Sequence, residues 1–202
     1  RKRPVFAWGL RNSVDFLWSP NGELWANHNG SDGLGDDLPP EEIVIPVQEN
    51  RSHGWPYCYT PDFGVVTQPE MKYPYISTGW NCDEVIPAIF TTLAHASPLG
   101  MALGDSRLFP QEYQNSLYIS YSGSWDDFAT TNHPDCKIER ILLEDGQPAS
   151  EETFALFYRE EGKECGAYGT WGRPVDIIFG PNGDMYISDD LGMRVYRVTY
   201  NP

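Results

Sequence analysis

Basic side chains stand shortly before three apolar stretches of this sequence. Arg11 precedes the first stretch, His95 the second and Arg173 the third. A guanidinium group is costly to bury without an anionic partner, and it binds carboxylates through paired hydrogen bonds. We interpret the three side chains as occupants of corresponding positions in a repeat, which together favour a ligand that carries several carboxylates.

Polar residues follow each of the same three stretches. These exits are Asn29-Gly30-Ser31-Asp32, Ser122-Gly123-Ser124-Trp125 and Ser188-Asp189-Asp190. Gly, Ser and Asp are also common in ordinary loops, so the exits become a site only if the fold makes them converge. The remaining histidines, His28, His53 and His133, lack metal-ligand spacing and are interpreted as loop or packing residues.

The elements that must position these residues form a repeat. "VDFLWSPNGELWANHNG" from Val14, "LGMALGDSRLFPQEYQNSLYISYSGS" from Leu99 and "VDIIFGPNGDMYISDDLG" from Val175 each read as strand, turn and strand. The middle copy has a longer hairpin. Asn21-Gly22 and Asn182-Gly183 supply the positive φ angles that a tight hairpin or its bulge requires.

The long repeat favours a β-propeller over a sandwich, whose strands recur at shorter spacing without a matching long period. "CKIERILLEDG" and "MRVYRVTY" are further strand candidates, whereas "PPEEIVIPV" and "PASEETFALF" could give a helical turn or two at most. We therefore predict an all-β chain in which residues 1–202 form one partial propeller domain of about three blades. Such an arc exposes two sheet edges, which favours association.

Composition excludes several partners. A formal charge of −15 repels nucleic acid and anionic membranes, and no apolar run is long enough to span a bilayer. The start "RKRPVF" lacks a signal h-region and reads as a mature or truncated piece. Asn50 and Asn29 each begin a glycosylation sequon.

The cysteines indicate an oxidising compartment. Cys58 with Cys82 and Cys136 with Cys165 form two local pairs by sequence, although four cysteines allow three connectivities. No CxxC spacing is present, so two disulfides in a secreted protein are favoured over a zinc site.

Four segments taken in order, "GLRNSVDFLWSPNGELWANHNGSDGLGDD", "HGWPYC", "AHASPLGM" and "GRPVDIIFGPNGDMYISDDLGMRVYRV", carry a family resemblance. Together they resemble the C-terminal half of the soluble quinoprotein sugar dehydrogenases, in particular the branch of sorbosone dehydrogenase and fungal pyranose dehydrogenase. The resemblance implies a six-bladed propeller that holds pyrroloquinoline quinone (PQQ) and calcium, oxidises a sugar and passes electrons to an external acceptor such as a cytochrome.

The resemblance also implies roles for individual residues. Arg11 and Asn12 match the Arg-Asn pair that faces the quinone, and His95 and Arg173 match cofactor-contacting positions. Gly30 and Ser31 match positions whose backbone carbonyls hold calcium. In the implied mechanism a histidine base removes the sugar hydroxyl proton while hydride passes to the quinone, and calcium and Arg11 stabilise the charge that develops on the quinone oxygen.

Two departures from the family are visible. The catalytic histidine of the family lies on an earlier blade that this chain does not contain, so the chain alone is predicted to be inactive. "SGSWDD" differs in charge from relatives that place a basic residue near that strand end. The alternatives are a non-catalytic propeller that binds glycans or proteins and a lactonase-type calcium propeller, which would need a ring of side-chain carboxylates.

Overall fold

The computed structural model describes residues 4–62, 68–69, 81–104, 107–124, 136–157, 165 and 171–201. Within these residues the helices are two short 3₁₀ turns, η1 (Cys82–Glu84) and η2 (Gln111–Tyr113), and the other elements are strands. No helix in this part of the chain has the length and apolar character needed to cross a bilayer. The chain divides into two compact units, residues 1–95 and 96–202.

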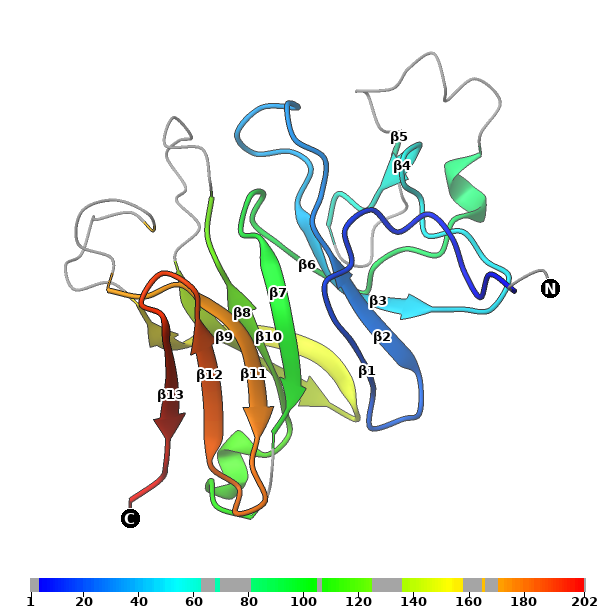
Figure 1. Cartoon of the computed structure of the whole chain (residues 1–202). Helices are drawn as coiled ribbons and strands as arrows, with labels where there is room; N and C mark the ends of the chain where they lie inside the picture. The colour runs from blue at the N-terminus through cyan, green and yellow to red at the C-terminus, as the bar shows by residue number, and fades with distance from the viewer. Residues whose placement is uncertain are drawn as a thin grey trace. The chain divides into compact units, whose positions relative to one another are not determined.

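The first unit contains a four-stranded antiparallel sheet in the order β1-β2-β3-β6 (Figure 1). Its strands are β1 (Phe16–Trp18), β2 (Leu24–His28), β3 (Glu41–Val47) and β6 (Phe90–Thr92). Two further short strands, β4 (Cys58–Tyr59) and β5 (Gln68–Pro69), pair with each other in the connection between β3 and β6. The sheet is therefore a four-stranded blade with an elaborated loop before its last strand.

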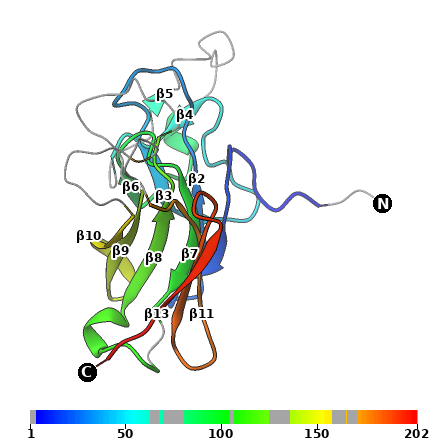
Figure 2. The same cartoon turned by 60° about the vertical axis from the view of Figure 1, so that its left-hand side comes forward.

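The second unit contains two antiparallel sheets, in the orders β10-β9-β8-β7 and β11-β12-β13. Their strands are β7 (Pro98–Leu103), β8 (Ser116–Tyr121), β9 (Lys137–Glu144), β10 (Gln147–Leu156), β11 (Pro174–Phe179), β12 (Met185–Asp189) and β13 (Arg194–Val198). β11 lies beside β7 in both views (Figures 1 and 2). Ser120 joins the two sheets, because its hydroxyl donates to the carbonyl of Val175 over 2.7 Å.

Each unit has its own apolar core. In the first unit Trp25, Ile43 and Val44 are fully buried on β2 and β3. In the second unit Tyr118 and Ile138 of one sheet pack with buried side chains of the other, among them Ile177, Met185 and Ile187. This packing of sheet against sheet is how neighbouring blades of a propeller bury their faces.

The two Asn-Gly turns have the same backbone geometry. The Gly22 N–H donates to the Ser19 carbonyl over 3.0 Å, and the Gly183 N–H donates to the Gly180 carbonyl over 2.9 Å. The glycine of each pair has positive φ, 81° at Gly22 and 87° at Gly183, while the asparagine does not. This pattern is typical of a hairpin loop closed by a glycine bulge, which confirms the predicted turns.

The predicted repeat is confirmed at the level of single hydrogen bonds. In each copy a side-chain oxygen on the second strand accepts a backbone N–H from the first strand or from the residue just before it. The pairs are Asn27 with Asp15 (3.3 Å), Ser120 with Gly100 (3.0 Å) and Ser188 with Asp176 (3.0 Å). The longer middle hairpin is also as expected, with η2 between β7 and β8.

Two expectations about secondary structure were wrong. The stretch "PPEEIVIPV" forms β3, a buried strand paired with both β2 and β6, and it contains no helical turn. "PASEETFALF" forms most of β10, which pairs only with β9 and leaves most of its side chains accessible. β10 is the outer strand of its sheet, so few of its side chains need to be apolar. The polar composition of this stretch therefore resembled that of a helix.

The two predicted local cysteine pairs are confirmed. Disulfides join Cys58 to Cys82 and Cys136 to Cys165. The first ties β4 to η1 in the first unit, and the second belongs to the apolar core of the second unit. The two bonds join cysteines 24 and 29 positions apart in the sequence, so each restricts the unfolded chain.

Candidate functional site

Arg11 lies over the exit of β2. Its Nη1 donates to the carbonyls of Gly30 (2.6 Å) and Asn29 (3.2 Å), and its Nη2 pairs with the Asp32 carboxylate at 2.9 Å. The adjacent Asn12 forms an isolated antiparallel bridge with Asn29, which sets the arginine beside this exit. The backbone oxygens at Asn29 and Gly30 thus already face a cationic group.

Glu41 of β3 binds the backbone of Gly30, and the next residue, Ser31, is buried. The Gly30 N–H donates to the buried Glu41 carboxylate over 2.6 Å, and a Cβ at Gly30 would lie 2.9 Å from the Pro39 ring. The Ser31 side chain is 3% exposed, and its hydroxyl has no partner among the described residues. Carbonyl, hydroxyl and carboxylate oxygens are the donors that calcium prefers, so the exit of β2 fits a calcium ion.

A buried pair of His28 and Glu42 lies on β2 and β3 next to this exit. His28 Nε2 lies 2.7 Å from Glu42 Oε2, and both side chains are almost fully buried. The second oxygen of Glu42 accepts the Thr60 N–H over 2.8 Å. Burial alone would raise the pKa of Glu42, but His28 and the hydrogen bonds from Thr60 outweigh it and hold the pKa below its ordinary value.

His53 is another buried polar side chain in the first unit, and its Nε2 accepts the Gln48 N–H over 3.3 Å. Burial lowers the pKa of His53 from 6.5 to about 4, while Glu42 acts in the opposite sense. Between about pH 6.5 and about pH 4, His53 therefore binds a proton in the unfolded chain but not in the folded protein.

We expect the free energy of unfolding to fall as the pH drops from about 6.5 to about 4. Replacing His53 with glutamine, which can still accept the Gln48 N–H, should flatten this slope. Urea unfolding at several pH values measures it. A His53→Gln slope equal to that of the parent protein would contradict the assignment.

Arg173 is bound at the exit of β12. Its guanidinium contacts the Asp190 carboxylate through two hydrogen bonds of 2.7 and 2.6 Å, which raise the pKa of Arg173 above its ordinary value. The buried Asp189 accepts the backbone N–H groups of Arg173 and Gly192 and the hydroxyl of Tyr196. Asp189 thus orders the turn on which the Arg173–Asp190 pair rests.

His95 contacts the loop that follows β2. Its Nε2 lies 2.9 Å from the Gly35 carbonyl, so this nitrogen carries the proton of the hydrogen bond. His95 has φ of 65° and Ser97 has φ of 51°, in the left-handed region that side chains other than glycine rarely adopt. The segment before β7 is therefore held in a costly backbone conformation.

Strand pairing corrects the idea that Arg11, His95 and Arg173 occupy equivalent positions. The matched side chains on the second strands are Asn27, Ser120 and Ser188, and the residue two positions after each donates its N–H to the carbonyl of an equivalent residue. These pairs are Asn29 with Asn12, Ser122 with Ser97, and Asp190 with Arg173. Arg11 therefore precedes the shared position by one residue and His95 precedes it by two. Sequence spacing alone was too coarse to detect these offsets.

Several site residues were missed in the sequence. Glu41 and Glu42 belong to "PPEEIVIPV", for which the sequence predicted a helical turn or two at most, yet both are buried on β3. His28 was expected to be a loop or packing residue, and its burial on β2 agrees with a packing role, whereas its contact with Glu42 was not predicted. Among the residues that the structure describes, no three His, Cys, Asp or Glu side chains gather to hold a metal ion. His133 and the "WDD" of "SGSWDD" lie outside the described residues.

The chain is similar to several known proteins. An uncharacterized protein of Borreliella burgdorferi is 31% identical over 203 residues, which cover 99% of this chain and 50% of that protein. The holo form of the pyranose dehydrogenase PQQ domain from Coprinopsis cinerea matches 96% of this chain and 55% of its own, with a TM-score of 0.73 and 17% identity. A calcium structure of the Trichoderma reesei carbohydrate-active enzyme family AA12 matches 94% and 52%, with a TM-score of 0.69 and 22% identity.

The sheet orders, the repeat and these structural neighbours define the chain as an all-β segment of a β-propeller with about three blades. The profile of the TrAA12-like family matches residues 2–201, and the chain belongs to that family. The resemblance found in the sequence is thereby confirmed. The chain spans about half the length of the relatives it matches.

Proposed function

We propose that the protein containing this chain is a PQQ- and calcium-dependent sugar dehydrogenase and that residues 1–202 are the C-terminal half of its propeller domain. The family match and the pyranose dehydrogenase neighbour support this class. The observation that carries the proposal for this chain is the exit of β2, where backbone oxygens, a buried unpartnered hydroxyl and an arginine come together. Two disulfides support secretion as the setting.

The calcium ion would be held by the backbone carbonyls of Gly30 and Ser31. In this structure the Gly30 carbonyl accepts from Arg11, so the guanidinium would have to release that oxygen for an ion to bind it. Arg11 and Asn12 then remain beside the ion, where Arg11 can donate to an anionic oxygen of the cofactor. Bound PQQ supplies the two-electron acceptor for the alcohol carbon of the sugar.

Gly30 is expected to tolerate no side chain. Gly30→Ala places a methyl group 2.9 Å from Pro39, and relieving that contact shifts the carbonyls on either side. We expect the variant to be about 1–3 kcal/mol less stable and to bind calcium more weakly. Thermal unfolding with and without calcium measures both effects. Asp36→Ala, in the exposed part of the same loop, is the control and should change neither value.

The carboxylates of PQQ would be bound by basic side chains, with Arg173 and His95 as further contacts. Arg173 already binds a carboxylate in paired geometry through Asp190, so its side chain is set up for this kind of group. The left-handed backbone at His95 and Ser97 supports a functional role for that segment, because such strain is frequent at ligand sites.

The general base of the reaction is expected on a part of the protein outside this chain. His28 is buried against Glu42 and faces no solvent, which makes it unsuited to abstract a proton from a sugar. Residues 1–202 alone should therefore show no sugar oxidation. Dye-linked, PQQ-dependent oxidation of glucose or fucose by the isolated chain would contradict this expectation.

The test uses the full-length natural protein. PQQ and calcium are added to the cofactor-free protein, and the absorbance of the bound quinone is recorded before and after a panel of aldoses. Saturable PQQ uptake followed by sugar-dependent bleaching, with transfer to an artificial electron acceptor, is the expected result. Absence of PQQ uptake would instead favour a non-catalytic binding propeller or a lactonase-type protein.

A further inference from the structure

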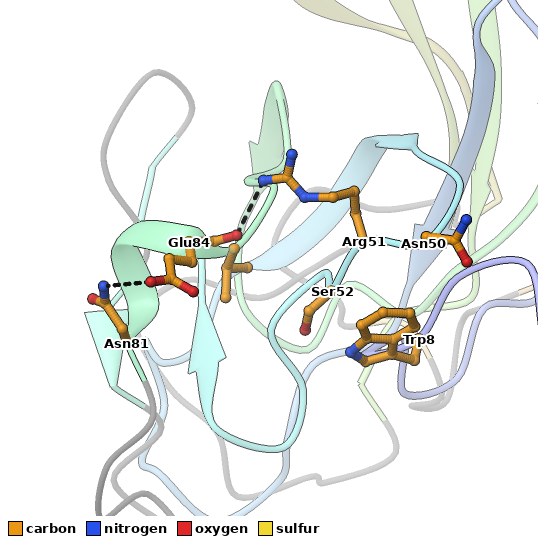
Figure 3. Close-up of a pocket in the computed structure, with 7 residues that line it drawn as sticks. Trp8, Asn50, Arg51, Ser52, Asn81 and Glu84 are labelled. Atoms are coloured by element: carbon orange, nitrogen blue, oxygen red, sulfur yellow. Dashed lines mark hydrogen bonds between the residues drawn. The ribbon is translucent and has the colours of Figure 1, made fainter.

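A surface pocket of about 440 Å³ lies in the first unit, and none of its residues has a part in the site proposed above (Figure 3). Figure 3 shows Trp8 and Asn50 on one side of this pocket and Asn81 and Glu84 on the other. Arg51 and Ser52 complete its polar lining. The volume is in the range of small-molecule sites, which makes the pocket a candidate binding site.

The pocket has a rigid frame. Trp8 pairs with Ser52 in a parallel bridge, and its backbone exchanges hydrogen bonds with Arg51 and His53. On the opposite side Asn81 caps η1, which the disulfide at Cys82 fixes to β4. A ligand would therefore meet side chains that are already in place, and little ordering cost would accompany its binding.

The lining favours a polyhydroxylated ligand. Trp8 is 46% exposed and offers an apolar ring face with a polar N–H. Around it stand amide, guanidinium, hydroxyl and carboxylate groups, which include both donors and acceptors. A sugar presents the complementary surface, because its C–H face can stack on an indole while its hydroxyl groups both donate and accept.

The charges in the pocket and on the whole chain indicate which class of saccharide would bind. Arg51 and Glu84 bring one charge of each sign to the pocket, and Arg51 is anchored to the Glu84 carbonyl over 3.2 Å. The chain as a whole carries −15, which disfavours acidic glycans. We propose that this pocket is a binding site for a neutral saccharide and that Trp8 is its stacking platform.

The inference is independent of cofactor chemistry, so it is tested with PQQ-free full-length protein. Production in a bacterial periplasm lets both disulfides form and leaves Asn50 without a glycan. Calorimetric titration with cellotetraose and mannotetraose, at low and high salt, should show saturable binding of at least one of them with little salt dependence. Tetragalacturonic acid should bind more weakly than the neutral saccharide.

The variants separate stacking from general surface effects. Trp8→Ala should weaken binding of the neutral saccharide about tenfold or more, as expected when an aromatic anchor is removed. Trp18→Ala is the matched control, because Trp18 is also exposed but lies outside the pocket, and it should bind as the parent protein does. PQQ uptake should be unchanged in Trp8→Ala.

A measurement on the unaltered sequence keeps the test decisive if Trp8→Ala fails to fold. Addition of the neutral saccharide should shift the indole N–H resonance of Trp8 and leave that of Trp18 in place. The proposal is overturned by any of three results: no binding of either neutral saccharide, equal effects at the two tryptophans, or tighter binding of the acidic oligomer. None of these results bears on PQQ uptake.

Discussion

Arg173→Ala is expected to weaken PQQ binding by about a hundredfold, because truncating one partner of a hydrogen-bonded charge pair costs about 2–5 kcal/mol. The side chain that is lost binds a carboxylate through two hydrogen bonds in the structure. Arg173→Lys should bind PQQ more weakly than the parent protein and more tightly than Arg173→Ala, since an ammonium group cannot make the paired contact. Titration of the full-length protein with PQQ, followed by quinone absorbance, measures the change.

Asp190→Asn is the matched control for this experiment. Asp190 competes with an incoming carboxylate for the Arg173 guanidinium, so its neutralisation should leave PQQ binding unchanged or make it a few-fold tighter. Weaker PQQ binding by Arg173→Ala together with tighter binding by Asp190→Asn would show that Arg173 binds the cofactor. Asp190 would then be the partner of Arg173 when no cofactor is bound. Unchanged PQQ uptake by Arg173→Ala would remove this residue from the site.

Glu42→Ala is expected to cost about 3–5 kcal/mol of stability, because it leaves His28 and the Thr60 N–H buried without their partner. Urea unfolding of the full-length protein measures the loss. Glu49→Ala, on an exposed residue just after β3, should change the stability by only a few tenths of a kcal/mol. Similar losses for the two variants would show that the buried pair is unimportant.

The pH dependence of this pair has a defined sign. Because the folded-state pKa of Glu42 lies below its ordinary 4.5, its stabilising contribution is complete above that value and is lost as the pH falls through the lower folded pKa. Glu42→Gln should remove this loss below about pH 4.5. The slope that we assign to His53 begins at higher pH, so the two groups can be told apart.

The sequence predicted those features that depend on neighbouring residues. The Asn-Gly turns, the paired strands around them and the longer middle hairpin follow from local backbone preferences, and the structure confirms each of them. The family could also be inferred, because four segments in a fixed order are specific even where each alone is short.

The sequence did not predict features that depend on distant partners. Glu41 and Glu42 follow two prolines in a stretch for which a helical turn or two was predicted. Their burial on a strand depends on Gly30, His28 and Thr60, which bind them. The supposed equivalence of Arg11, His95 and Arg173 failed for a related reason. An offset of one or two residues is invisible in spacing and becomes visible only in the ladder of hydrogen bonds.

Arg11 gives the exit of β2 a resident positive charge. Without a divalent ion, the oxygens of Asn29 and Gly30 have this guanidinium as their partner. If the full-length protein has the calcium-dependent activity proposed above, we expect a chelator to abolish sugar oxidation without unfolding the protein, and added calcium to restore it. The proposed calcium ion would then be exchangeable, because the β2 exit keeps its hydrogen bonds to Arg11 when the ion is removed.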